Sequence, residues 1–154
     1  MRERKVHLND AMPLIREKLN AGHEVTFSPH GTSMLPFLRD GRDTVTLTLP
    51  QGRLKKYDVA LYQRRNGQYV LHRVARVGKD NYTFIGDNQF VIEAGIEDDR
   101  IIGVCSSYIR KGKLITAKSP LWKAYAVFWN YSRFPRRVMA ALYRRAARLF
   151  RRGN

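Results

Sequence analysis

The stretch QYVLHRVARVGKDNYTFIGDN, residues 68–88, carries the pattern that decides the fold. Its first ten residues are rich in Val, Leu and Tyr, and the segment NYTFI after the break is again β-branched and aromatic. The break itself, GKDN at residues 78–81, offers the Gly, Asp and Asn that tight turns require. The stretch therefore predicts two antiparallel strands joined by a short turn.

Segments of the same composition lie on both sides of this hairpin. They are EVTFS (24–28), DTVTLTL (43–49), YDVALYQ (57–63), RIIGVCSSYI (100–109) and KLITA (113–117). Breaks containing Gly, Asn or Asp separate them, and Asn66-Gly67 is a strong hairpin signal. We expect a mainly β fold, an antiparallel sheet or barrel.

Helical patterns flank the β region. NDAMPLIREKLN, residues 9–20, has a cap residue, a Pro near the first turn and apolar residues at helical spacing. After Ser119 we expect two helices, broken near Pro135. The second places apolar residues opposite a face of arginines: Met139, Leu142, Ala146, Leu149 and Phe150. The chain thus divides into residues 1–118, a β-rich domain with an N-terminal helix, and residues 119–154, a basic amphipathic segment.

Charge is distributed unevenly along the 154 residues, whose net charge is +16. Residues 100–154 contain fourteen Lys or Arg and no Asp or Glu, so the rest of the chain carries only +2. This asymmetry predicts an acidic partner surface, either anionic lipid or nucleic acid.

The N-terminal twenty residues contain charges throughout, unlike a secretory signal, and no run approaches the about 18 apolar residues of a membrane span. We expect a cytoplasmic protein, peripheral on the inner face of the membrane if the C-terminal segment binds lipid. The single cysteine, Cys105, lies in the apolar run IIGVC, where we expect it to pack rather than react.

A candidate nucleophile lies in the segment HGTSMLP, residues 30–36, between two predicted strands. A serine in such a loop can expose its hydroxyl, and Gly31 lets the backbone approach a substrate closely. The segment is also consistent with an ordinary loop, because Ser33 needs a base that removes its proton before it can attack a carbonyl.

His72 is the histidine best suited to be that base. Of the four histidines, only His72 lies within a predicted strand. By the alternation of a strand it shares a mostly apolar face with Val70 and Val74. The alternative is a half-buried histidine that hydrogen-bonds only to the backbone.

Several motifs together resemble a known family. TSMLPFLRDGRD, KKYDVALY, YVLHRV, IGDN and IIGV occur in the order found in the type I signal peptidases, serine endopeptidases whose clan includes the LexA-like self-cleaving repressors. The resemblance covers roughly residues 28–105. It implies that Ser33, followed by Met34 and Pro36, is the nucleophile. The base is lysine in most bacterial members and histidine in the endoplasmic-reticulum and archaeal type, which His72 matches.

The resemblance also implies acidic residues. Asp87 matches the Gly-Asp-Asn aspartate, which is expected to help orient or stabilise a histidine base. A second acid usually follows, and Glu93, Asp98 and Asp99 are the candidates; Glu93 has the closest spacing but replaces an aspartate. Two other residues in the motifs, Arg73 and Gly103, are expected to have structural roles.

The oxyanion formed during attack on an amide needs preorganised donors. The backbone N–H of Ser33 is the obvious hydrogen-bond donor. We expect Gly31, Ser33 and Met34 to form the segment that binds the oxyanion and the substrate. Gly31 stands where some members of the family carry a donor hydroxyl, so that donor is absent. The sequence has no CxxC, HExxH or Gly-rich phosphate loop, and we expect neither a metal nor a cofactor.

Typical signal peptidases carry a hydrophobic helix before the serine, whereas here a charged segment precedes Ser33. Residues 120–154 either bind an anionic membrane surface or pack on the sheet. Nucleic-acid binding is the weaker alternative, because no reading motif accompanies the arginines. The sequence thus favours a serine endopeptidase that removes a leader or signal segment; the alternative is a LexA-like protein that cuts itself or binds DNA.

Overall fold

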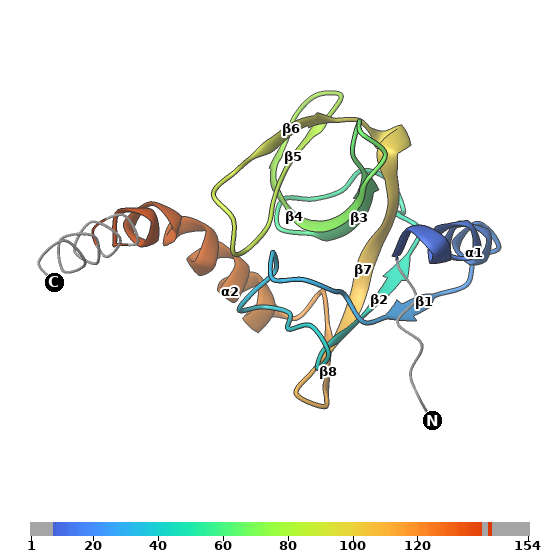
Figure 1. Cartoon of the computed structure of the whole chain (residues 1–154), viewed down its shortest axis with the longest axis horizontal. Helices are drawn as coiled ribbons and strands as arrows, with labels where there is room; N and C mark the ends of the chain where they lie inside the picture. The colour runs from blue at the N-terminus through green and yellow to red at the C-terminus, as the bar shows by residue number, and fades with distance from the viewer. Residues whose placement is uncertain (1–7, 140–141, 143–154) are drawn as a thin grey trace, which may run out of the picture.

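The computed structural model describes residues 8–139 and residue 142. The strands are β1 (Val25–Phe27), β2 (Thr44–Thr48), β3 (Val59–Gln63), β4 (Tyr69–Val77), β5 (Tyr82–Ile85), β6 (Glu93–Ile96), β7 (Ile101–Arg110) and β8 (Lys113–Thr116). They form one antiparallel sheet in the order β1-β2-β7-β3-β4-β5-β6, with β8 also paired to β7 (Figure 1). The expected antiparallel, mainly β fold is confirmed. The sheet is not closed into a barrel, since β1 and β6 stand at its two ends.

The hairpin predicted from residues 68–88 is present as β4 and β5. Arg73 pairs with Ile85, Val74 with Phe84, and a bulge follows before Val77 pairs with Tyr82. The Gly78 N–H donates to the Asn81 carbonyl at 2.8 Å, which closes the turn. This hairpin places His72 two residues before Val74, on the same face of β4.

Two clusters of buried side chains lie on the two faces of the sheet. The first is covered by helix α1 (Leu8–Asn20), which contributes Met12, Ile15 and Leu19. Gly103 lies under this helix: a Cβ there would be 3.2 Å from the Leu19 side chain. The second cluster contains the inward side chains of β3, β4 and β5, including Tyr62, Val74 and Phe84. Cys105 is buried in the first cluster, and burial raises the pKa of its thiol.

Strand β6 and the short 3₁₀ turn η1 (Asp98–Arg100) were not predicted. The β6 sequence, EAGI, holds Glu, Ala and Gly, which are depleted in strands, and Gly95 has a φ of 73°. Pairing with β5, in which Tyr82 faces Ile96 and Phe84 faces Glu93, makes it a strand. Tertiary pairing therefore outweighs local propensity here.

Helix α2 (Pro120–Tyr131) begins after Ser119, as expected, and the expected break between two helical stretches is present three residues before Pro135. The break lies at Ser132, and residues 133–139 are helical again. Pro135 is tolerated because it falls in the first turn of that second stretch, where its missing N–H has no helical partner to lose.

One face of α2 packs on the domain. Trp122 and Tyr125 contact Phe37, with ring centroids 5.0 and 5.6 Å apart. The indole N–H of Trp129 donates to the Asp87 carbonyl at 2.8 Å. The sequence left open whether residues 120–154 pack on the domain or bind a surface, and this face of α2 packs on the domain. In the part of the chain that the structure describes, none of the helices has the length and apolar character needed to traverse a bilayer.

Candidate functional site

The segment between β1 and β2 carries Ser33 at its bend. Gly31 has a φ of 96°, which favours glycine, and its N–H donates to Oδ2 of Asp40 at 3.1 Å. Met34 is buried in the first cluster and anchors the segment, whereas Ser33 is only partly covered. The hydroxyl of Ser33 is therefore held on a fixed loop and accessible from outside.

The Gly-Asp-Asn turn after β5 clamps this loop. The Asn88 backbone N–H donates to the Ser33 carbonyl at 2.8 Å, and its side-chain amide donates to the Thr32 carbonyl at 3.1 Å. A Cβ on Gly86 would lie 2.7 Å from the Ser33 carbonyl oxygen, so only glycine permits this approach. These contacts fix Ser33 beside the end of β5.

The strand register relates this end of β5 to the part of β4 that carries His72. Gly86 directly follows Ile85, which pairs with Arg73, the chain neighbour of His72. Among the described residues the Ser33 hydroxyl hydrogen-bonds to none, and its backbone N–H has no backbone acceptor.

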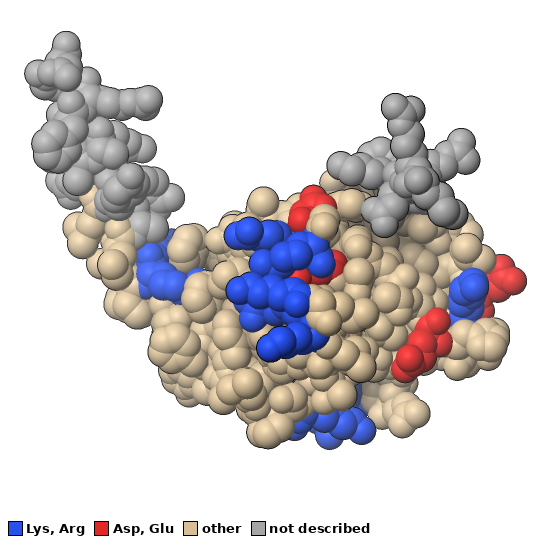
Figure 2. All heavy atoms as spheres, turned by 90° about the horizontal axis from the view of Figure 1, so that it is seen from below, with Lys and Arg blue, Asp and Glu red and all other residues tan. Residues whose placement is uncertain are grey.

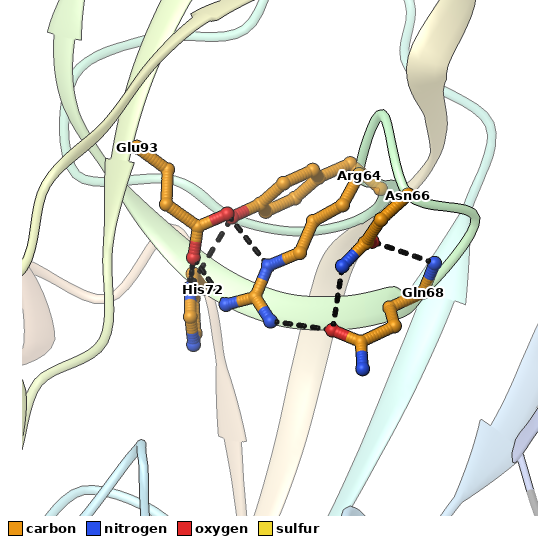
Figure 3. A network of polar contacts seen from close by, with 6 residues as sticks. Arg64, Asn66, Gln68, His72 and Glu93 are labelled. Carbon is orange, nitrogen blue, oxygen red and sulfur yellow. Dashed lines mark hydrogen bonds and ion pairs between the residues drawn. The ribbon is translucent and has the colours of Figure 1, made fainter.

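His72 is buried, with 2% of its surface exposed, and one ring nitrogen is engaged. Nδ1 lies 3.3 Å from Oε1 of Glu93 and 3.3 Å from the hydroxyl of Tyr62. Figure 3 shows Nε2 at the opposite end of the ring, pointing away from Glu93. A carboxylate beside Nδ1 favours the tautomer with the proton on Nδ1, which leaves Nε2 as a proton acceptor.

Glu93 reaches His72 across the sheet. It lies on β6 opposite Phe84, which is opposite Val74, so two strand spacings, about 10 Å, separate its backbone from β4. A glutamate is longer than the aspartate expected from the family, and this length suits the span. Asp98 instead accepts a hydrogen bond from Tyr82, and Asp99 is exposed. Of the three candidates for the second acid, the structure places Glu93 beside His72.

Arg64, a residue that the sequence did not single out, holds Glu93 in place. Its Nε donates to Oε2 of Glu93 at 2.7 Å, and Nη2 donates to Oε1 (Figure 3). Nη1 of the same guanidinium donates to Gln68 at 3.0 Å. The spacing of Arg64 and Glu93 in the sequence gives no signal, because β6 itself was not predicted.

Burial and these charges set the protonation of the pair. Burial lowers the pKa of His72 below its ordinary value of 6.5; Glu93 raises it in part, and Arg64 lowers it again. Burial alone would raise the pKa of Glu93, but hydrogen bonds from Arg64 and Tyr62 lower it. At neutral pH the site therefore holds a neutral imidazole beside an ionised carboxylate.

Asp87 has a different partner from the one expected. Its two oxygens accept hydrogen bonds from Nε and Nη2 of Arg73 at 2.8 and 2.7 Å, and both side chains are buried. Arg73 also donates to the Tyr57 carbonyl and lies over the ring of Phe37. Adjacent residues in a strand point to opposite faces of the sheet. Arg73 therefore pairs with Asp87, whereas His72 lies beside Glu93. Asp87 thus fixes the turn that clamps Ser33.

A groove of about 1390 Å³ opens at Ser33. Its walls come from the start of α1, from the Ser33 loop with Met34, and from residues 69–71 of β4. The groove is large enough for several residues of an extended peptide.

A scan of the chain against protein-family models finds no match, and a search among curated proteins also finds none. Residues 8–139 and 142 hold no group of three or more His, Cys, Asp or Glu arranged to bind a metal ion.

Proposed function

We propose that the protein is a serine endopeptidase of the signal peptidase type, which removes a leader or signal segment from a peptide or protein. The observation that carries the proposal is the contact of His72 Nδ1 with Glu93, on a strand next to the loop that holds Ser33. This arrangement orients a neutral base, and the groove at Ser33 offers room for a peptide. The resemblance of the five motifs supports the same assignment.

In this mechanism the substrate lies in the groove with its scissile carbonyl at Ser33. Nε2 of His72 takes the Ser33 proton as Oγ forms a bond to the carbonyl carbon. The carbonyl oxygen becomes an oxyanion, which the Ser33 backbone N–H is free to meet. His72 then gives its proton to the leaving amine as the C–N bond breaks, and an ester remains on Ser33.

Water completes the cycle. His72 takes a proton from the water, whose oxygen attacks the ester carbon, and returns it to Ser33 as the acyl group leaves. In both halves the imidazolium is stabilised by Glu93, whose carboxylate lies 3.3 Å from Nδ1. Asp87 and Arg73 are positioning residues in this scheme, because they act through the turn that holds the Ser33 loop.

The proposal is tested with a library of peptides from a protein digest, with new ends identified by mass spectrometry. We expect the purified chain to cleave a defined subset of peptides and Ser33→Ala to cleave none, because it removes the nucleophile. Ser119→Ala is the matched control, since the Ser119 side chain makes no cap hydrogen bond and lies at the start of α2. It should cleave like the unaltered chain.

Cleavage by Ser33→Ala at the unaltered rate would refute the assignment. The same experiment distinguishes the proposed peptidase from the LexA-like alternative. A chain that leaves every added peptide intact but cuts itself at one bond, in a reaction lost in Ser33→Ala, would be a self-cleaving protein instead.

A further inference from the structure

The two faces of α2 have different surroundings. Trp122, Tyr125 and Trp129 face the domain and are partly buried. Outside this packed stripe, α2 and the helical residues 133–139 that follow it carry exposed large apolar side chains, and Phe128 and Phe134 are 69% and 76% exposed. The others in this helical segment are Leu121, Val127, Tyr131, Val138 and Met139.

These exposed side chains recur at helical spacing. From Phe128 to Tyr131, Phe134 and Val138 the steps are three or four residues, with the turn at Ser132 between the first two and the last two. The helical residues after Ser132 also extend away from the sheet (Figure 1), and Phe134, Val138 and Met139 among them are exposed. An apolar stripe on an element that already packs by its other face marks an interaction surface.

A second apolar patch lies next to this helix. In the loop before β6, Val91 is 73% exposed, and its neighbours Phe90 and Ile92 are exposed as well. The loop follows Asp87, whose carbonyl accepts the Trp129 hydrogen bond, and Figure 1 shows it beside α2. The exposed apolar side chains of the loop and of the helical segment are together called here the apolar ridge: Phe90, Val91, Ile92, Phe128 and Phe134.

The charge of the C-terminal third indicates which kind of partner binds the apolar ridge. Residues 100–154 carry fourteen positive and no negative side chains, and Lys111, Lys113, Lys118 and Lys123 are exposed. Figure 2 shows Lys and Arg gathered over the middle of the face seen from below. A second copy of the chain would bring an equally basic segment and be repelled. An anionic lipid surface satisfies both the charges and the apolar side chains.

We propose that the apolar ridge binds the surface of an anionic bilayer, with its aromatic side chains among the headgroups and the basic residues beside the lipid phosphates. This binding does not depend on peptidase activity. It uses exposed side chains of α2, of the helical residues after it and of the loop before β6, which do not take part in the packing of Trp122 and Tyr125 on the domain.

The test measures sedimentation of the full chain with vesicles, either phosphatidylcholine alone or its equimolar mixture with phosphatidylglycerol. We expect strong binding to the mixture, weak binding to phosphatidylcholine, and a decrease with added salt as the charges are screened. The double variant Phe128→Ser, Phe134→Ser should reduce the partition coefficient by roughly tenfold or more, because two exposed aromatic rings no longer leave water.

The matched control is Leu14→Ser, Leu49→Ser, which removes two exposed apolar side chains outside the apolar ridge, 55% and 41% exposed. It should bind like the unaltered chain, and circular dichroism should show both variants folded. Ser33→Ala should also bind normally, which separates this result from the peptidase test. Equal binding by the Phe128, Phe134 variant, or a dimer in solution that this variant dissociates, would overturn the proposal.

Discussion

At the scale of single residues, the site depends on which charges face His72. Glu93 favours the protonated imidazole, whereas burial and the guanidinium of Arg64 oppose it. The same arginine also holds Glu93 through two hydrogen bonds. Arg64 thus orients the carboxylate of Glu93 and offsets part of its charge, which favours a neutral His72 imidazole at physiological pH.

We predict opposite shifts of the His72 pKa in two variants. Arg64→Gln removes a positive charge and should raise the pKa, whereas Glu93→Gln removes the negative charge and should lower it. The imidazole signals of His72, followed by NMR during a pH titration, give both values. Arg65→Gln is the matched control, because Arg65 is exposed and adjacent in the chain. Shifts of the same sign in the first two variants would show that Arg64 acts only through structure.

At the scale of elements, the sheet was readable from the sequence because seven of its strands have β-branched and aromatic residues between turn residues. The 68–88 hairpin and helix α1 were predicted close to their bounds. Strand β6 was not, since its Glu, Ala and Gly residues carry no strand signal. This one omission concealed how Glu93 reaches His72, because only the β5–β6 pairing brings the two together.

The turn after β5 shows a second limit of the sequence. The motif Gly86-Asp87-Asn88 was identified as functional, but the partner of Asp87 was not. Residues 72 and 73 are adjacent in the chain, and only the pleat of β4 determines that Arg73 turns to Asp87 while His72 turns to Glu93. The order of the motifs thus predicted a candidate site, and the tertiary structure shows which acid lies beside which base: Glu93 beside His72 and Asp87 beside Arg73.

We predict that Asp87→Asn destabilises the fold by about 3–5 kcal/mol, because it leaves the buried Arg73 charge without its carboxylate. Urea unfolding followed by circular dichroism measures this loss. Asp80→Asn, in the exposed turn of the same hairpin, is the control and should change stability by less than about 0.5 kcal/mol. A loss below about 1 kcal/mol for Asp87→Asn would mean that the pair does not hold the turn.

At the scale of the whole molecule, the basic C-terminal third and the site are connected through one turn. Asn88 of that turn holds the Ser33 loop, and the carbonyl of Asp87 accepts the Trp129 hydrogen bond from α2. The sequence left two roles open for residues 120–154, packing or binding a surface. The two faces of α2 make these roles compatible, since one face packs while the other stays exposed.

The most direct test of the site is the pH dependence of kcat/KM for a peptide that the chain cleaves. If neutral His72 is the base, kcat/KM rises as the imidazole loses its proton, with a midpoint below 6.5, because burial lowers the His72 pKa. It should then stay level at higher pH, and His72→Ala should lower it by about 100-fold to 10 000-fold. A rate that still climbs above about pH 9, where a lysine titrates, would contradict the role of His72.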